Sequence, residues 1–592
     1  MVMRRSTTSG DPTATLNRKI VTLRQGMANG VRDRLPNGSD YYYFKGIPYA
    51  RPPVGDLRFE PPVPLDKFPA TVLDCSQERS NYVGMNLLTR KITGREDGLY
   101  LNVYTPALPV RGQVEPKLPV MVFIHGGGLI GGSGDSLLYN PNYMVQEGVV
   151  FVTMNYRVGV LGLLCLPEAG IHGNGDLKDQ LMALRWVNEN ISKFGGDPSN
   201  VTLFGSSSGG SCVGLHCMSE TSKKYFHKAI MQCGHHMCDF TYGTEMVQKA
   251  RDLAKLFGYT GSCDKEALQV LKNVCDKEAL QVLKNVSAEQ LVQRQFEVLT
   301  PRERKLEEAY GIPFAHVIER RGTKDAVLTK NPMELIRTPG SFTMPIIIGT
   351  NDAEGSFELK NAIQHLEDYD NEVERLVPRS FNVDFFSTAA KQVGEEIKQL
   401  FFDGKPIAQT NIQDLSRYIS EKNSITSYVL AYFGSFVQKN PNIYQFFFTF
   451  DGALNNGKTI AKLPPLKGAG HMDELFYVFT SATLAEVPES DKAYQVRQTM
   501  VRLWTNFAKY SDPTPTSKST FPFRWEPVAL LNPGEEKSFD MKYLKIDHTP
   551  QMSTYDSERL GLWLRLHEKY NGHITNLPYP IDDMNLPEAT LK

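Results

Sequence analysis

The run FGSSSGG, residues 204–210, offers three serines as candidate nucleophiles. Only Ser207 has a glycine both two residues before it and two residues after it, at Gly205 and Gly209. In a tight turn from a strand into a helix, a Cβ at these two positions would clash with the flanking backbone, and the turn exposes the central hydroxyl. Taken alone, this spacing is more typical of a flexible loop. The β-like VTLF before it and the helix-like SCVGLHCM after it favour the tight turn, with Ser207 as nucleophile.

A second glycine-rich segment, His125–Gly128, directly follows the apolar run VMVFI. Consecutive glycines let backbone N–H groups point at one place without side chains in the way, which suits an oxyanion hole. An ordinary tight loop or a phosphate-binding turn would also use glycines, but no Lys-Ser or Lys-Thr follows, and this disfavours a nucleotide P-loop. The two glycine-rich segments, each after its own strand, are far more specific together than either is alone. Together they indicate a serine hydrolase.

A hydrolase of this type needs an acid and then a base later in the chain. Of the twelve histidines, His471 stands in the glycine-flanked segment KGAGHMDELF, and such a loop lets an imidazole reach over the turn that carries the serine. Glu354 follows the strand-like PIIIG, between the serine and the histidine, and Asp352 competes with it two residues earlier. Carboxylates after strands are often only caps, so the residues themselves leave the choice between these two acids open.

These segments need a rigid scaffold, and the surrounding pattern predicts an α/β fold. Val120–Ile124 and Val149–Met154 are continuous apolar runs typical of strands buried on both faces, and Val201–Phe204 is a third strand. Between them, an apolar stripe at i, i+4 and i+7 predicts a helix; its members are Leu177, Leu181, Leu184, Val187 and Ile191. Alternating strands and helices predict a large, mostly parallel central sheet with helices on both faces.

The domain organisation predicted from the sequence is simple. Although 592 residues would allow several domains, the motifs favour one, over residues 18–575. We expect a polar, disordered N-terminal segment (1–17) before it and a C-terminal tail (576–592) after it. The dozen residues Cys263–Val274 recur identically as Cys275–Val286. The second copy either lengthens a surface helix or reflects an error of sequence assembly, since a solenoid needs at least three units.

The composition excludes several classes of function. The formal net charge is −1 and 22% of the residues are charged, so there is no polybasic face for nucleic acid. No stretch reaches the roughly 18 apolar residues of a membrane helix, and no apolar segment follows the N-terminal arginines as in a signal peptide. We therefore expect a cytoplasmic protein with no nucleic-acid or membrane partner. The eight cysteines include no CxxC pair, and we expect no metal site.

Beyond these single motifs, the chain resembles the type B carboxylesterase and cholinesterase family over almost its whole length, and within that family it is most similar to the insect α-esterases. The matching segments are YYYFKGIPYARPPVGDLRF, EDGLYLNVYTP, FIHGGGLIGG, NYRVGVLGLL, GNGDLKDQLMALRWVNENISKFGGDP, FGSSSGG, GTNDAEGSF and GHMDELFYVF. The resemblance implies an α/β-hydrolase fold. It also implies a catalytic triad of Ser207, Glu354 and His471, in which Glu354 and not Asp352 is the acid.

The resemblance further implies that backbone N–H groups of Gly127, Gly128 and Ser208 form the oxyanion hole. The family usually has Glu before the nucleophile and Ala after it, whereas this chain has Ser206 and Ser208. Ser208 keeps the backbone donor, but Ser206 removes a buried carboxylate and could change the rate. Juvenile hormone esterases typically carry Gln at this position, so Ser206 counts against that assignment. Phe240 falls near the place of an acyl-pocket aromatic in related esterases, and ordinary core packing is the alternative.

The expected function is hydrolysis of carboxylic esters through a serine acyl-enzyme. We expect small hydrophobic substrates, xenobiotic or lipid-like, a role in detoxification, and organophosphates as covalent inhibitors. No cofactor is required. The alternatives are a slow-turnover esterase that sequesters its ligands, and a non-catalytic cholinesterase-like binding protein. The sequence predicts no oligomeric state.

Overall fold

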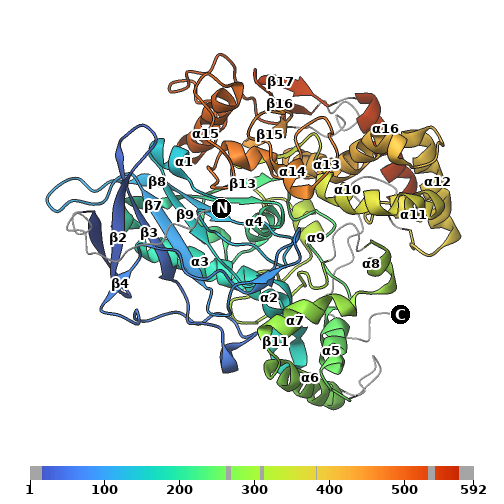
Figure 1. Cartoon of the computed structure of the whole chain (residues 1–592), viewed down its shortest axis with the longest axis horizontal. Helices are drawn as coiled ribbons and strands as arrows, with labels where there is room; N and C mark the ends of the chain where they lie inside the picture. Colours follow the sequence, from blue (N-terminus) through green and yellow to red (C-terminus); the bar gives the residue numbers. More distant parts are fainter. Residues whose placement is uncertain are drawn as a thin grey trace, which may run out of the picture.

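One large sheet forms the centre of the computed structural model, which describes residues 17–261, 269–306, 312–381, 383–530, 541–555 and 557–571. Thirteen strands among these residues belong to the sheet (Figure 1). They are β1 (Arg18–Leu23), β2 (Gly26–Arg34), β3 (Asp40–Pro48), β4 (Val72–Asp74), β7 (Tyr100–Thr105), β8 (Leu118–Ile124), β9 (Val150–Met154), β12 (Gly196–Ser206), β13 (Lys228–Gln232), β14 (Ile346–Asn351), β15 (Ile443–Phe448), β16 (Lys542–Ile546) and β17 (Gln551–Thr554). Two short pairs lie outside it, β5 (Gly84–Met85) with β6 (Ile92–Thr93) and β10 (Cys165–Leu166) with β11 (Ile171–His172).

The sheet is parallel in its middle and antiparallel at its edges. Its order is β1-β2-β3-β7-β9-β8-β12-β13-β14-β15-β16-β17, and β4 pairs with β2. All neighbours from β9 to β16 along this order are parallel, whereas β1 to β9 and the β16–β17 pair are antiparallel. The carboxyl ends of parallel strands meet at one edge of a sheet, so the loops after β8, β12, β13 and β14 come together there.

The three strands predicted from apolar runs are confirmed as β8, β9 and β12. The parallel register pairs Phe123 with Phe204 and Ile124 with Gly205. Every residue of β9 is buried, as expected for a strand that is covered on both faces. The predicted amphipathic helix is also confirmed, over Gly175–Asn190.

Helices cover both faces of the sheet. They are α1 (Asn142–Gln146), α2 (Gly159–Leu163), α3 (Gly175–Asn190), α4 (Ser208–Met218), α5 (Met246–Leu256), α6 (Gln269–Lys284), α7 (Ala288–Arg294), α8 (Pro301–Leu306), α9 (Pro332–Arg337), α10 (Ser356–Ala362), α11 (Leu366–Asn371), α12 (Thr388–Phe402), α13 (Ile412–Phe436), α14 (Gly457–Ala461), α15 (Lys492–Tyr510) and α16 (Ser557–Asn571). In Figure 1, α5, α6 and α7 lie together at the bottom of the view. Helices α10 to α13 and α16 gather at the upper right, on the same side as β15, β16 and β17.

Alternate residues of β8 pack into two separate apolar cores. Val120, Val122 and Ile124 belong to one core cluster. Met121 and Phe123 belong to the other. Because successive side chains of a strand point to opposite faces, the two clusters mark the two covered faces of the sheet. The predicted layering is therefore confirmed.

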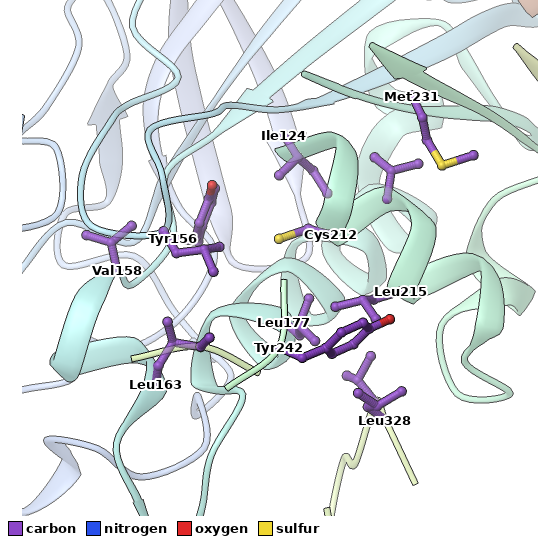
Figure 2. Close-up of a cluster of buried hydrophobic side chains, with 14 of the residues drawn as sticks. Ile124, Tyr156, Val158, Leu163, Leu177, Cys212, Leu215, Met231, Tyr242 and Leu328 are labelled. Carbon is purple, nitrogen blue, oxygen red and sulfur yellow. The ribbon is translucent and has the colours of Figure 1, made fainter. Parts of the chain in front are cut away.

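Part of the first core cluster lies beneath α4 (Figure 2). Cys212 and Leu215 of α4 share this apolar cluster with Ile124 of β8, Leu177 of α3 and Tyr156. All five side chains are at most 1% exposed. The helix that follows the serine turn is thus fixed against both the sheet and α3, and this fixes the orientation of its first residue.

The duplicated dozen falls on α6. Half of its first copy, residues 263–268, lies outside the described residues. In the second copy, Ala279 and Leu283 are fully buried and Asp276 forms an ion pair with Arg251 at 2.8 Å. The second copy therefore lengthens α6, with one face packed into the core and the other, at Lys277 and Glu278, exposed. The predicted N-terminal segment, apart from residue 17, and the predicted tail also lie outside the described residues, and the single domain over 18–575 stays a prediction.

Candidate active site

The turn between β12 and α4 presents Ser207. Its backbone has φ 57° and ψ −130°, a strained conformation for a residue with a side chain. A Cβ on Gly205 would lie 2.5 Å from the carbonyl O of Gly209, and one on Gly209 would lie 2.2 Å from that of Ile124. The two flanking positions therefore require glycine, because a Cβ at either of them would clash with the backbone, as their spacing in the sequence predicted.

Of the three adjacent serines, only Ser207 reaches a cavity. Ser206 and Ser208 are 0% exposed and do not line it, whereas Ser207 does. The backbone N–H of Ser207 donates to the carbonyl of Gln232 on the neighbouring β13 at 2.8 Å. This bond fixes the turn to the sheet edge, so the hydroxyl is held at one place.

The loop after β8 lies against this turn. A Cβ on Gly126 would come within 2.9 Å of Ser207 Cβ, and one on Gly127, where φ is 135°, would lie 2.0 Å from the carbonyl O of Gly131. Gly128 has φ 64° and lines the cavity. Glycine is needed here both for its positive φ and for the absence of a side chain. Tyr156 stabilises the loop, because its hydroxyl donates a hydrogen bond to the carbonyl of His125 at 2.6 Å.

Three backbone donors in this region have no acceptor in the part of the chain that the structure describes. Among the described residues, the N–H groups of Gly127, Gly128 and Ser208 donate to no other group. Ser208 is the first residue of α4, where N–H groups are unpaired within a helix and the helix dipole favours negative charge. Donors of this kind can stabilise an oxyanion.

His471 and Glu354 meet across two loops. Nδ1 of His471 is hydrogen-bonded to Oε1 of Glu354. The residues just before them, Ala353 and Gly470, form an isolated β-bridge that aligns the two loops. The backbone N–H of His471 also donates to Oγ of Ser356 at 2.9 Å. The competing acid, Asp352, instead accepts a hydrogen bond from the N–H of Ala469 at 2.6 Å.

The electrostatic surroundings favour a histidine that can carry a proton. Burial alone would lower the pKa of His471, but the Glu354 carboxylate outweighs this effect and the pKa lies above its ordinary value. Glu474, fully buried three residues later, has its pKa raised to about 7 by burial and by the charge of Glu354. It accepts hydrogen bonds from Asn351 at 2.6 Å and from Gln232 at 3.1 Å.

Ser207, Glu354 and His471 line one cavity of about 270 Å³. The Ser207 hydroxyl makes no hydrogen bond to the imidazole among the described residues; such catalytic bonds commonly tighten only when substrate is bound. Phe240 lies on the cavity wall and is half-buried, so it is not a core residue. Further apolar side chains of the wall are Leu87, Leu88, Ile312 and Phe357.

Two residues close to His471 were not identified from the sequence. Cys233 lines the cavity directly after β13, the strand beside β12, and Glu474 is buried beside Glu354 and His471. A signal for Cys233 exists, because chemically active residues gather after the central strands of an α/β sheet. No local pattern marks Glu474, whose position depends on how the two loops pack.

A sequence profile of the Carboxylesterase family matches residues 17–563. The chain belongs to this family. Esterase B1 of Culex pipiens is 30% identical to it over 557 residues, which span 92% of this chain and 97% of that protein. Juvenile hormone esterase of Tribolium castaneum is 28% identical over 577 residues, covering 92% of this chain and 93% of that protein.

The same relationship is seen among solved structures. The crystal structure of juvenile hormone esterase from Manduca sexta, with OTFP covalently attached, has a TM-score of 0.78 and 27% identity to this carboxylesterase; the match covers 93% of this chain and all of that chain. The predicted α/β-hydrolase fold and the resemblance to insect esterases are confirmed. This carboxylesterase is accordingly a carboxylic ester hydrolase, whose ligands are small-molecule esters.

Proposed function

We propose that this carboxylesterase cleaves esters through a covalent acyl-enzyme on Ser207, with His471 as general base and Glu354 as the acid that orients it. The observation that carries the proposal is the hydrogen-bonded His471–Glu354 pair in the same cavity as the strained Ser207. Nucleophile, base and orienting acid together are what serine acyl transfer requires. The scheme uses no cofactor.

In the first step, Ser207 Oγ attacks the ester carbonyl while His471 accepts its proton. Glu354 holds the imidazole in the tautomer that leaves the other ring nitrogen as a base, and it stabilises the imidazolium that forms. The oxyanion accepts hydrogen bonds from the unpaired N–H groups of Gly127 and Gly128 and from that of Ser208. His471 then donates its proton to the leaving alcohol, and the acyl group remains on the serine.

In the second step, water attacks the acyl-enzyme with the same histidine as base. The tetrahedral intermediate uses the same backbone donors, and its collapse releases the acid and restores the serine hydroxyl. A cavity of about 270 Å³, whose wall combines apolar side chains such as Leu87 and Phe357 with charged ones such as Glu358 and Lys360, supports small esters with a hydrophobic acyl or alcohol group. We assign Phe240 to the substrate-binding wall.

An organophosphate tests this assignment, because it mimics the tetrahedral geometry and remains bound to the nucleophile. After stoichiometric inhibition and proteolysis, mass spectrometry is expected to locate the adduct on the peptide that contains Ser207. A suitable control is Ser199→Ala, an exposed serine at the other end of β12, which should be labelled like the wild type. An adduct on any other serine would refute the mechanism.

Sequestration with slow turnover is a second candidate function, favoured by the side chain before the nucleophile. Ser206 is fully buried and its hydroxyl has no hydrogen-bond partner among the described residues. A stoichiometric burst of p-nitrophenol with little steady release would support sequestration. Sustained turnover would establish a hydrolytic enzyme.

The biological setting is a further proposal. Detoxification of xenobiotic or lipid-like esters is consistent with the small, partly apolar cavity. A cytoplasmic location is supported by the free thiols of Cys75, Cys217 and Cys233. Within the described residues, no helix combines the length and apolar character that crossing a bilayer demands. Fractionation of the native tissue and assay of each fraction against p-nitrophenyl acetate would test the location.

A further inference from the structure

We propose that Cys233, Glu354 and His471, here called the cavity cluster, form a site at which a thiophilic divalent cation such as Zn²⁺ or Cd²⁺ binds and blocks the esterase. The cation would be an inhibitor and not a cofactor. Its binding can be measured without turnover, whereas the inhibition rests on the proposed function.

The geometry of the cavity cluster carries this proposal. A thiol sulfur, a carboxylate oxygen and an imidazole nitrogen of these residues all lie within 4.8 Å of one another. Four-coordinate Zn²⁺ binds sulfur at about 2.3 Å and nitrogen or oxygen at about 2.0–2.2 Å, so three atoms this close can share one ion after small side-chain movements. Water or a substrate oxygen can supply the fourth ligand.

The thiol is fixed in place by its backbone. Cys233 has φ 49°, and its N–H donates to the carbonyl of Gly349 on β14 at 2.9 Å. Its side chain is only 7% exposed, and that exposed part belongs to the cavity wall. An ion that enters the active-site cavity therefore reaches the thiol without unfolding the protein.

Two carboxylates, those of Glu354 and Glu474, lie near the Cys233 thiol. Burial and the carboxylates of Glu354 and Glu474 raise the pKa of the Cys233 thiol well above its ordinary value. A divalent cation reverses this preference, because a coordinated thiol is deprotonated outright. Binding then releases the thiol proton to solvent, and the ion bonds to the thiolate, the carboxylate and a neutral imidazole nitrogen.

Coordination would stop catalysis at its first step. Glu354 would bind the ion and could no longer orient the imidazole, and the ion-bound His471 could not accept the proton of Ser207. Substrate and ion would compete for the same cavity. Chelation of the ion should restore activity fully, which distinguishes coordination from oxidation of the thiol.

A second group of the same side-chain types provides an internal control. Asp176, Cys212 and His316, here called the sealed cluster, also offer three ligand atoms within 4.8 Å. Each of the three side chains is at most 1% exposed, and Cys212 lies in the apolar core beneath α4 (Figure 2). Neither the active-site cavity nor the second cavity beside it, which Phe240 and Ile312 also line, is lined by any of these three residues. We therefore expect no rapid metal binding there.

The decisive comparison is Cys233→Ser against Cys212→Ser. In the wild type, Zn²⁺ should inhibit hydrolysis of p-nitrophenyl acetate reversibly. Cys233→Ser should raise the half-inhibitory Zn²⁺ concentration, measured against its own uninhibited rate, by more than about tenfold, since even losing a group that only orients a metal ligand costs about 10–100-fold in affinity. Cys212→Ser should keep the wild-type sensitivity.

Direct binding is measured by titrating the full chain with Cd²⁺ and recording the thiolate-to-metal charge-transfer absorption. One equivalent should produce the band in the wild type and in Cys212→Ser, and the band should disappear in Cys233→Ser. His471→Ala should retain the band but require at least tenfold more Cd²⁺. A band that persists in Cys233→Ser, or equal Zn²⁺ inhibition of Cys233→Ser and the wild type, would overturn the proposal. Because the band requires no catalysis, it tests the site even if the acyl-enzyme mechanism fails.

Discussion

The cavity cluster and the sealed cluster contain the same kinds of side chain in different surroundings. In both, an imidazole is hydrogen-bonded to a carboxylate and a cysteine lies beside the pair. In the sealed cluster, the second ring nitrogen of His316 is also bonded, to the carbonyl of Thr241 at 2.8 Å. In the cavity cluster, the second ring nitrogen of His471 has no partner within the described part of the chain.

This difference separates a structural ion pair from the His471–Glu354 pair that we propose to be catalytic. Burial would lower the pKa of His316, but the Asp176 carboxylate outweighs burial and raises the pKa well above its ordinary value. Both ring nitrogens of His316 are hydrogen-bonded and the ring is fully buried, so it has no free nitrogen with which to act as a base. His471 has a raised pKa too, yet it faces a cavity that holds a strained serine and unpaired backbone donors. An imidazole–carboxylate pair thus becomes catalytic through access and neighbours, not through its own composition.

The largest effect should separate the two histidines. His471→Ala should lower kcat by about 10⁶-fold, as expected for loss of the base in a serine triad. His316→Ala should leave kcat of the folded protein within a few-fold of wild type but lower stability by about 3–5 kcal/mol, because it leaves the Asp176 carboxylate buried without its partner. Turnover of p-nitrophenyl acetate and the thermal unfolding midpoint measure the two effects. A comparable loss of kcat in folded His316→Ala would erase the distinction.

Substitution of the two candidate acids, Glu354 and Asp352, should separate their kcat values by a smaller factor than substitution of the two histidines does. Glu354→Gln should lower kcat by about 10⁴-fold, because the amide stabilises the wrong tautomer. It should also shift the acidic limb of the pH profile to lower pH, since His471 must be neutral to act as base and the Glu354 charge is what raises its pKa. Asp352→Asn is the matched control, as Asp352 bonds the N–H of Ala469. The assignment of the acid is wrong if Asp352→Asn is the more damaging change.

The next largest effect is expected for substitution in the glycine loop that lines the cavity. Gly127→Ala should reduce kcat by about 10²–10³-fold, the loss that accompanies removal of one oxyanion donor, because its Cβ would force the loop away from Gly131. Gly112→Ala serves as control, since Gly112 also has a positive φ, 82°, but no atom lies within 4 Å of its added Cβ. Rates from initial velocities should separate the two variants. Equal rates would show that the loop contributes nothing to the oxyanion.

The smallest effect is expected for Glu474, the buried acid beside the His471–Glu354 pair. Glu474 helps to raise the pKa of His471, though less than Glu354 does. Glu474→Gln should therefore move the acidic limb of kcat/KM to lower pH by less than Glu354→Gln does, with only a few-fold loss of rate. Profiles measured over pH 5 to 9 with a neutral substrate would show this. A shift to higher pH would contradict the electrostatic account.

The sequence predicts those parts of the fold and site that depend on local pattern. Two-sided burial makes β8 and β9 visible as apolar runs, and close backbone contact makes Gly205 and Gly209 obligatory on either side of Ser207. The choice of Glu354 over Asp352 depends on an imidazole more than a hundred residues away, so it came only from the family resemblance.

Other features could not be predicted because they exist only after long-range packing. The sealed cluster joins residues from α3, α4 and the segment before α9, and no spacing in the chain relates them. Cys233 becomes part of the site because β13 lies beside β12. The second copy of the duplicated dozen packs inward through an ion pair with Arg251, which composition does not reveal.

Ser207 is the central residue of the proposed mechanism, and its role is tested most directly by the turnover of Ser207→Ala beside Ser199→Ala, with p-nitrophenyl acetate as substrate. We predict a fall in kcat of about 10⁶-fold for Ser207→Ala and wild-type turnover for Ser199→Ala. Substantial turnover by correctly folded Ser207→Ala would contradict the account.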